Sequence, residues 1–440
     1  MPDRSTTGQS RPSRRVFLKK SAVLLGAGAL GSLSAQRAAH AAGSDVLRIG
    51  LVGCGGRGSG AAVNAMNASP ANRLVAMADA FAERIELSRQ QLQKAKPDQF
   101  AVDADHSFVG FDGYRQLLAG DVDVVILATP PHFRPIHLRA CVDAGKHVFA
   151  EKPVAVDAPG ARAVLAACED AKKKGLSIVS GLCWRYHAGV RETVQRVLDG
   201  AIGRVVAVRT TYNCGPPWFR NVARQPNQSE MEYQMRNWYP FTWLSGDHNV
   251  EQHVHSLDKA AWVLGDKPPV RAWGMGGRQV RTEDAIGNIF DHHAVVYEYD
   301  DGPEVYSYCR RQAGCYNDTS DHILGTKGRA NILKFRIEGE NPWRYDGPKT
   351  NMYDAEHVAL FDSIRENQPI NDGLHMTQST MWAILGRMVT YTGKQITWQE
   401  AMDSAETLAP QQYTWDAAPP VLPDESGNYP LAVPGITQFS

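Results

Sequence analysis

The chain has 440 residues, which is long enough for two to three domains and for a sizeable hydrophobic core. Lys and Arg together number 47, and so do Asp and Glu, so the formal net charge is zero. This balance excludes the overall basic surface with which proteins bind nucleic acid or anionic membranes. The seven cysteines form no CxxC pair and no zinc-site spacing, so we interpret them as buried small apolar residues, with a Cys309–Cys315 disulfide as the alternative.

The first 41 residues have the three parts of a secretory signal. Ser13-Arg14-Arg15-Val16-Phe17-Leu18-Lys19 is the basic part, an apolar stretch from Ala22 to Ala35 follows, and Ala39-His40-Ala41 is a small-residue cleavage site. The apolar stretch is too short and too rich in glycine to span a membrane, so we expect no membrane span after processing. The twin arginine with Phe-Leu-Lys resembles the signal of the Tat pathway, which exports folded proteins. We therefore predict a periplasmic or otherwise exported protein, with the Tat export machinery as a partner.

Residues 45–183 are predicted to form a doubly wound α/β domain of the Rossmann type. Strand-like and helix-like segments alternate here, as in a sheet of parallel strands with helices on both faces. Residues 122–128 read Val-Asp-Val-Val-Ile-Leu-Ala, a nearly continuous apolar run that suits a buried parallel strand. The predicted strands cover residues 46–52, 73–79, 122–128, 147–150 and 176–179, and the predicted helices cover residues 61–66, 82–92, 132–144 and 158–174.

A glycine-rich motif of the dinucleotide-binding type follows the first predicted strand. Gly53-Cys54-Gly55-Gly56-Arg57-Gly58 matches G-x-G-x-x-G, and Asp79 closes the second strand 26 positions after Gly53. In such a motif the first glycine permits a tight turn, the second lets pyrophosphate approach the backbone, and the third lets the helix pack on the sheet. Asp79 can bind ribose hydroxyls and would repel a 2′-phosphate, which favours NAD over NADP, although Arg57 and Arg84 could each reach a phosphate. The predicted cofactor-binding residues of this region are Gly53, Gly55, Gly56, Arg57, Gly58 and Asp79.

The pattern changes near residue 184. From there to residue 408, after a helix at 190–198, strand-like runs dominate at residues 205–212, 270–274, 293–299, 305–310 and 330–335, and late helices are predicted at 356–364 and 380–392. Turn sequences such as Asp300-Asp301-Gly302 indicate an α+β domain with a mostly antiparallel open sheet, which we expect to bind substrate and form oligomer contacts. Residues 409–440 hold six prolines and are predicted to be an irregular C-terminal tail.

Polar and aromatic residues of this second domain are candidate substrate ligands. Arg185 and Tyr186 stand where the chain leaves the first domain. Trp238 belongs to an aromatic stretch, residues 218–243, whose flat rings would suit the apolar faces of a sugar; packing within the protein is the alternative. A dense set of metal-ligand types also occurs here, but its spacing matches no standard site and we expect no metal. This set comprises Asp247, His248, Glu251, His253 and His255.

Four segments together resemble the Gfo/Idh/MocA family of oxidoreductases. They are Gly53 to Gly58, Ala128-Thr129-Pro130-Pro131-His132, Glu151-Lys152-Pro153 and His255-Ser256-Leu257-Asp258, in this order. The family includes inositol dehydrogenases, glucose–fructose oxidoreductases and NAD-dependent α-N-acetylgalactosaminidases. The resemblance covers nearly all of the chain after the signal. It implies an NAD cofactor, a carbohydrate or glycoside substrate and a homo-oligomer.

The resemblance also implies roles for individual residues. Lys152 would lie near the nicotinamide and the reacting hydroxyl, where its ammonium group favours a developing alkoxide. His255 would act as general base or acid. Asp258, which we also count among the catalytic residues, would orient or anchor more than it reacts. The remaining motif residues, Thr129, Pro130, His132 and Glu151, would border the cofactor.

One position departs from the dehydrogenases of this family. Many of them carry Asp four residues before the catalytic His, whereas this chain has Glu251, which we include as a substrate ligand, followed by Gln252. A Gln at this place also occurs in the glycosidase branch. The resemblance therefore indicates the class of chemistry more firmly than the substrate.

Export places a constraint on the chemistry. Free nicotinamide dinucleotide should be scarce outside the cytoplasm, so an exported enzyme should retain its cofactor and return it to its starting state in each turnover. We therefore predict an NAD(P)-dependent oxidoreductase that acts on a sugar or glycoside by hydride transfer to and from a tightly held nicotinamide. The net reaction is then redox-neutral, either between two sugars or by oxidation, elimination, hydration and reduction that cleaves a glycoside. A sugar dehydrogenase with exchangeable NAD and a non-catalytic carbohydrate-binding protein are the alternatives.

Overall fold

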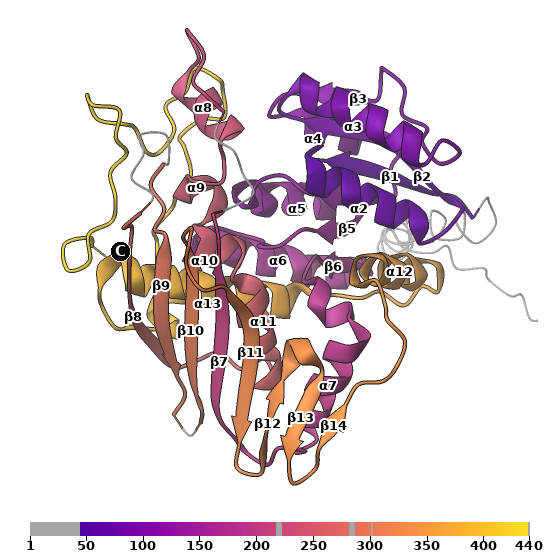
Figure 1. Ribbon diagram of the computed structural model, residues 1–440. Coiled ribbons are helices and arrows are strands. Elements are labelled where there is room, and N and C mark those ends of the chain that lie inside the picture. Colours follow the sequence, from indigo (N-terminus) through magenta and orange to yellow (C-terminus); the bar gives the residue numbers. More distant parts are fainter. Residues whose placement is uncertain (1–44, 217–221, 281–286, 301, 439–440) are drawn as a thin grey trace, which may run out of the picture. The chain divides into compact units, whose positions relative to one another are not determined.

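The protein is described by a computed structural model that covers residues 45–216, 222–280, 287–300 and 302–438 (Figure 1). The predicted signal peptide lies outside the described residues, and so do Trp218 and Phe219 of the aromatic stretch. Residues from Leu47 onward form one compact unit, which holds both sheets of the protein. Within the described residues, no helix is long and apolar enough to cross a membrane.

Six parallel strands form the first sheet in the order β3-β2-β1-β4-β5-β6. Strand β4 is buried along its whole length because helices cover both faces of the sheet. One face packs against α2 (Gly56–Asn67), α3 (Ala82–Ala95) and α12 (Met352–Arg365), and the other packs against α4 (Gly113–Ala119), α5 (Arg134–Asp143) and α6 (Ala158–Lys174). The predicted Rossmann domain is thereby confirmed. Its strands are β1 (Leu47–Val52), β2 (Asn72–Asp79), β3 (Ser107–Val109), β4 (Val124–Leu127), β5 (His147–Ala150) and β6 (Ile178–Ser180).

Helix α12 reaches this sheet from the late part of the sequence. Its Leu360 and Phe361 are fully buried in the same core cluster as α2 and α3. The chain that follows α12 then runs beside β6, where the Ile178 amide donates to the Ile370 carbonyl at 2.8 Å and the Asp372 amide donates to the Ile178 carbonyl at 2.9 Å. Residues within the predicted second domain, 184–408, therefore cover and extend the first sheet in space.

Nine strands form the second sheet in the order β14-β13-β12-β11-β7-β10-β9-β8-β15. Neighbouring strands are antiparallel except β7 and β10, which run parallel. This confirms the predicted mostly antiparallel sheet (Figure 1). The strands are β7 (Val205–Cys214), β8 (Arg271–Gly277), β9 (His292–Glu298), β10 (Glu304–Arg311), β11 (Asp318–Gly325), β12 (Gly328–Asn331), β13 (Arg336–Gly339), β14 (Trp343–Arg344) and β15 (Ile396–Thr397).

One long helix, α13 (Gly373–Thr392), joins the two layers. It packs against β8 and β9 of the second sheet and against α6 of the first domain. Its Trp382 is fully buried and stacks on Tyr297 of β9, with the ring centroids 5.0 Å apart. Helix α11 (Val254–Val263) lies between α13 and β7, and α7 (Ala188–Leu198) packs on α11. Helix α11, which carries His255, is therefore packed between α13 and β7.

Two local predictions differ from the structure. The strand predicted at residues 330–335 is correct only at its start, because β12 ends at Asn331 and the turn η3 (Ile332–Lys334) follows, with Phe335 at a φ of 50°. Strand β11 was not predicted, because its first residues are polar and show no apolar alternation. Several helices were also not predicted. They are α4, α11, η2 (Cys183–Tyr186), α8 (Glu230–Arg236), α9 (Thr242–Ser245), α10 (His248–Glu251) and α14 (Trp398–Asp403). The start of the helix predicted at residues 132–144 forms η1 (Pro131–Phe133).

The C-terminal tail is irregular, as we predicted, and the cysteines form no disulfide among the described residues. Residues 409–438 contain no helix or strand. All seven cysteines are free; five are buried, Cys214 is partly buried and Cys315 is exposed. The Cys309–Cys315 disulfide that we kept as an alternative is therefore absent.

Candidate active site

A cavity of about 650 Å³ runs along the carboxyl ends of β1, β2, β4 and β5. The strand order reverses between β1 and β4, and ligands of open α/β sheets bind at such a switch point. The glycine loop and Asp79 lie on the wall of the cavity, and so do Lys152 and His255. Its size suits a ligand of cofactor dimensions. Further lining residues are Arg84, Phe111, Thr129, Pro130, Arg134, His137, Glu151, Cys183, Met235, Trp238, Glu251, Gln252 and Tyr353.

The glycine loop has the shape that a dinucleotide needs. Gly53 has a φ of +97°, and a Cβ there would lie 2.5 Å from the Thr129 amide nitrogen. A Cβ on Gly58 would lie 1.9 Å from the Gly53 carbonyl oxygen, so only glycine lets α2 begin this close to β1. Gly55 and Gly56 have nothing within 4 Å of a Cβ position, which leaves room for phosphate at the N-terminus of α2.

Asp79 closes β2 beside this loop. Its carboxylate accepts hydrogen bonds from the Cys54 amide at 2.7 Å and from the Phe81 amide at 3.0 Å. Burial raises the pKa of Asp79, while these two hydrogen bonds act in the opposite direction. Asp79 thus fixes the glycine loop and also presents a carboxylate to the cavity. The open phosphate position and this carboxylate together fit a bound dinucleotide.

Lys152 and Glu251 meet on the cavity wall. Lys152 follows β5, and its Nζ donates to the backbone carbonyl of Glu251 at 2.6 Å and to Glu251 Oε1 at 3.0 Å. The two side chains are 14% and 12% exposed, so the charge pair is mostly shielded from water. The Lys152–Pro153 peptide bond is cis. Glu251, which we predicted as a substrate ligand, therefore holds the ammonium group in place.

His255 is the second residue of α11 and lies on the same cavity wall. Burial, followed by the positive charges of Lys152 and Lys259, lowers the pKa of His255 well below its ordinary value. The imidazole is therefore neutral near pH 7. Its Nδ1 has no hydrogen-bond partner among the described residues. A neutral imidazole beside an ammonium group can accept a proton from a substrate hydroxyl.

Comparison with known proteins identifies the family. The model of the oxidoreductase family with an NAD-binding Rossmann fold, GFO_IDH_MocA, matches residues 47–179, and the GFO/IDH/MocA C-terminal domain matches residues 190–331. The chain belongs to the Gfo/Idh/MocA oxidoreductase family. Members of this family bind NAD and include enzymes that act on sugars.

Individual relatives are distant. Inositol 2-dehydrogenase of Rhizobium meliloti is 27% identical over 285 residues, which cover 64% of this chain and 74% of that protein. The 2,7-anhydro-N-acetylneuraminate hydratase of Escherichia coli is 26% identical over 48% of this chain and 51% of its own length, so this chain spans about half of that relative. The WlbA dehydrogenase of Bordetella pertussis, solved with NADH and UDP-GlcNAcA, has a TM-score of 0.60 at 19% identity and covers 80% of this chain and 98% of its own; it shows the shared fold.

The Gfo/Idh/MocA motif residues Arg57 and Glu151 form an ion pair at the cavity. Arg57 Nε lies 3.0 Å from Glu151 Oε1, and the guanidinium lies 5.0 Å from the ring centroid of Tyr353. The Glu151 carboxylate therefore neutralises the positive charge of Arg57. Arg84 remains as a second arginine on the wall near Asp79.

Besides Gly58, which packs α2 against the Gly53 carbonyl, four residues with predicted site roles lie outside the cavity lining. Asp258 accepts hydrogen bonds from Arg185 Nε and Ser379 Oγ, each at 2.8 Å, and is 1% exposed. Arg185 also pairs with Asp266, and Tyr186 donates to Asp372 at 3.0 Å. Because a buried carboxylate needs a charged or hydrogen-bonding partner, these contacts are structural. We therefore withdraw the catalytic role of Asp258 and the substrate-binding roles of Arg185 and Tyr186.

His132 is the fourth of these residues. Its Nε2 is 2.8 Å from the hydroxyl of Tyr413 in the C-terminal tail, and its ring meets Trp243 edge-on with the centroids 5.0 Å apart. Burial lowers the pKa of His132 to about 4. His137, one helical turn further along, lines the cavity in its place. The predicted contact of His132 with the cofactor is thus replaced by packing against the tail.

The aromatic stretch divides into two parts. Trp238, which we predicted as a substrate ligand, lines the cavity together with Met235. Tyr239, Phe241 and Trp243 are at most 1% exposed and belong to the protein core. Packing within the protein, which we kept as the alternative, therefore describes these three rings.

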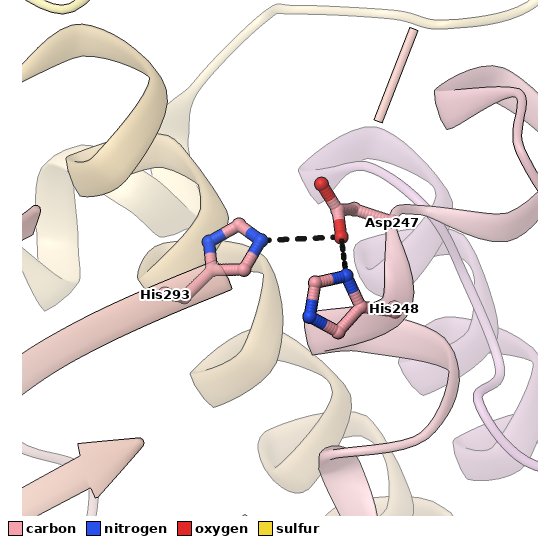
Figure 2. A group of neighbouring side chains, drawn as sticks. All are labelled: Asp247, His248 and His293. Carbon is pink, nitrogen blue, oxygen red and sulfur yellow. Dashed lines mark hydrogen bonds and ion pairs between the residues drawn. The ribbon is translucent and has the colours of Figure 1, made fainter. Parts of the chain in front are cut away.

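The predicted set of metal-ligand types also divides. Glu251 and His255 line the cavity, whereas His253 Nε2 bonds Ser307 Oγ at 2.7 Å. Asp247 and His248 instead meet His293 of β9, as Figure 2 shows. Asp247 Oδ1 is 2.8 Å from His248 Nδ1 and 3.2 Å from His293 Nε2. Sequence reasoning missed His293 in this cluster because β9 is distant in the chain.

Other lining residues gave no sequence signal. Tyr353 and Cys183 reach the cavity from α12 and η2, which lie outside every recognised motif. Arg134 is 3% exposed and donates from Nε to the Glu151 carbonyl at 2.6 Å, so it braces the loop that carries Lys152. Only the position of Arg134 just after the Thr129-Pro130 segment could have indicated it.

Proposed function

We propose that the protein oxidises a hydroxyl group of a sugar or glycoside by hydride transfer to a nicotinamide held in the 650 Å³ cavity. The observation that carries the proposal is the placement of Lys152 and His255 on the wall of the cavity that also contains the glycine loop. Hydride transfer needs the reacting carbon, the nicotinamide and a proton acceptor in one water-poor space.

The two residues divide the work between them. His255, neutral at pH 7, takes the proton of the substrate hydroxyl as the carbon–hydrogen bond breaks. Lys152 stabilises the negative charge that develops on the same oxygen, and Glu251 keeps the ammonium group in position. A bound nicotinamide supplies the acceptor for the hydride. Trp238 offers an aromatic face on the cavity wall to the ring of the sugar.

The cavity favours NAD over NADP. Asp79 presents a carboxylate where the ribose of the adenosine half would lie, and a 2′-phosphate there would meet a like charge. Arg57, one of two arginines that could bind such a phosphate, is already paired with Glu151. Arg84 and Arg236 also line the cavity, and Arg236 is paired with Glu83.

A second feature supports a cofactor that stays bound. Phe81 and Phe111 of the Rossmann domain and Arg236 of α8 line the cavity beside Asp79, and Trp415 of the tail packs behind the two Phe rings; we name these four residues the clasp. Arg236 forms an ion pair with Glu83 and lies 4.1 Å from the ring centroid of Phe81. Trp415 packs on Phe81 and Phe111, with centroids 5.1 and 4.5 Å apart. We infer that these contacts hold the wall at the adenosine end of the cavity in place and slow the loss of a bound dinucleotide.

A retained cofactor leads to a redox-neutral net reaction. The first route oxidises one sugar and reduces a second. The second route oxidises a glycoside at C3, eliminates the aglycone across C1–C2, adds water and reduces the ring again. We favour the second route, because one relative is a hydratase and hydration is itself redox-neutral.

The test uses purified protein, aryl glycosides in deuterated water, and no added NAD. We expect release of the aglycone and deuterium at C2 of the sugar. Replacement of Lys152 by Ala should lower kcat by roughly 10²–10³-fold, while Lys173→Ala, an exposed lysine on α6, should not.

The other outcomes are equally specific. Release without deuterium at C2 would eliminate the second route, and reduction of an added second sugar would support the first. Turnover that requires added NAD would show an exchangeable dehydrogenase. Sugar binding without any turnover, unchanged in Lys152→Ala, would show a binding protein.

A further inference from the structure

Asp247 adopts a backbone conformation that is rare for any residue except glycine. It has a φ of +83° and a ψ of 159°, directly before α10. Such a conformation persists in a non-glycine residue only where the surroundings determine it, and it is enriched at functional sites. Asp247 is fully buried and precedes Glu251, the partner of Lys152, by four residues.

The side chain of Asp247 is bound on every side (Figure 2). Oδ1 meets His248 Nδ1 and His293 Nε2 at 2.8 and 3.2 Å. Oδ2 accepts from the Phe290 amide at 3.0 Å and from the Tyr391 hydroxyl at 2.5 Å. Burial alone would raise the pKa of Asp247, but His293 and His248 together lower it well below its ordinary value. The carboxylate is therefore ionised and saturated with donors.

Helix α13 connects this cluster with both sides of the active site. Tyr391 contacts Asp247, and Thr390 Oγ1 lies 2.9 Å from His293 Nδ1. Arg387 donates to the carbonyl of Gly246 at 3.2 Å and to the carbonyl of Val156 at 2.6 Å. Val156 belongs to the segment that follows Lys152. The start of α10 and the Lys152 segment are therefore attached to one buried helix.

The other end of α10 carries the catalytic contact. Four residues of helix advance the chain by only about 6 Å, so a shift at Asp247 reaches Glu251 almost undiminished. Glu251 offers both its carbonyl and its carboxylate to Lys152. Only Gln252 and His253 separate α10 from α11, whose second residue is His255.

We propose that Asp247, with His248 and His293, is a positioning centre that sets the location of the Lys152–Glu251 pair. None of these three residues lines the cavity, so they act through α10. The proposal rests on the proposed function, since its main readout is turnover.

The experiment separates positioning from stability by a pair of variants. Asp247→Ala removes the carboxylate and keeps the strained backbone, whereas Asp247→Gly removes the carboxylate and relieves the strain. We expect kcat to fall by roughly 100-fold in both, because a displacement of about 1 Å is that costly, with KM for the sugar and the retained NAD nearly unchanged. The Tm of the Gly variant should exceed that of the Ala variant. Recovery of kcat in the Gly variant, in step with Tm, would overturn the proposal.

Further variants distinguish a loss of positioning from a loss of folding. His293→Gln retains a donor for Asp247 and should keep most of the activity, whereas His293→Ala should not; equal activity of the two would contradict the proposal. Asp372→Asn is the matched control, because Asp372 is a buried carboxylate that accepts from the Ser180 amide and Tyr186 outside the cavity. It should lower Tm without lowering kcat.

Two more measurements complete the test. Elemental analysis of the purified protein should find no stoichiometric transition metal. A stoichiometric metal would show that Asp247, His248 and His293 form a metal site, which would overturn the proposal of a hydrogen-bonded centre. A crystal structure of Asp247→Gly should show a changed Lys152–Glu251 contact. If wild-type protein turns over no sugar, the proposed function fails, but an unchanged contact in that crystal structure would still overturn the positioning role on its own.

Discussion

At the scale of single residues, burial decides what the ionisable groups can do. His255 lies in the cavity wall, where the loss of water and two nearby lysines keep the imidazole uncharged. Lys152 forms a mostly buried ion pair with Glu251. On an exposed surface the imidazole would take up a proton at about pH 6.5 and water would screen the ion pair, so the fold supplies the chemistry as much as the sequence does.

The acid limb of the pH–rate profile should reflect His255. Its pKa in the folded protein is lowered, so the neutral base persists as the pH falls through 6.5. We expect kcat/KM to hold down to well below pH 6.5 in the wild type. His255→Gln should lose roughly 10²–10⁴-fold in kcat/KM at every pH while retaining NAD. An acid limb centred at or above pH 6.5 in the wild type would contradict the assignment of the base.

His357 shows the cost of a buried polar ring. It is fully buried in α12, stacks on Phe149 with the centroids 4.1 Å apart, and neither ring nitrogen has a partner among the described residues. Burial, followed by the charge of Arg57, lowers the pKa of His357 to about 3. In the unfolded chain His357 is protonated as the pH falls below about 6.5, whereas in the folded chain it stays neutral down to about pH 3. The free energy of unfolding therefore falls as the pH drops from 6.5 towards 3.

Replacement of His357 by Phe should remove this pH dependence. Phe keeps the stacking on Phe149 and leaves no unpaired polar atom, so we expect a gain of about 1–3 kcal/mol in the free energy of unfolding near pH 7. Denaturant titrations of both proteins at several pH values would measure it. The slope between pH 3 and 6.5 should be smaller in the variant, and an unchanged slope would assign the acid sensitivity to other buried histidines.

At the scale of elements, late parts of the chain complete sites that early parts begin. Helix α12 brings Tyr353 to the cavity and covers the first sheet, and α13 holds the Lys152 segment through Arg387. The tail, although it has no regular structure, places Tyr413 against His132 and Trp415 against Phe111. An irregular segment is thus part of the wall behind the cofactor site.

The clasp gives a prediction at this scale. Trp415→Ala and Arg236→Ala should each speed the loss of NAD, because each removes contacts that close the adenosine end of the cavity. Native mass spectrometry after timed dialysis would measure the retained fraction. Trp398→Ala, a partly buried tryptophan of α14 outside the cavity lining, is the matched control and should retain the cofactor. Equal loss from all three variants would show that the clasp has no special role.

At the scale of the whole molecule, export and assembly remain predictions. Replacement of Arg14 and Arg15 by Lys should keep the precursor in the cytoplasm, because the twin arginine is the feature that the Tat machinery reads. Cell fractionation with an antibody against the mature chain would measure this. Export of the double variant at the wild-type level would contradict the Tat assignment. Sedimentation of the mature protein would test the homo-oligomer that the family resemblance implies.

The sequence by itself determined the class of fold and the cofactor loop, because both depend on local patterns. Gly53 follows directly on β1, Gly58 lies in the first turn of α2, and Asp79 ends β2; the apolar runs of the two strands mark them as buried. Glu151-Lys152-Pro153 and His255 were found because each motif is contiguous. Local backbone needs and strand burial are encoded over a few residues, so a single sequence can display them.

Tertiary structure alone decided which of the motif residues face the cavity. His132 and His137 are separated by only five positions, yet packing against Tyr413 turns the first into the core, while the second lines the cavity. Asp258 is paired with Arg185, which is 73 residues away, and Asp247 with His293, which is 46 residues away. A buried charge takes whichever partner the fold brings near it, and that partner is set by packing between distant elements rather than by neighbours in sequence.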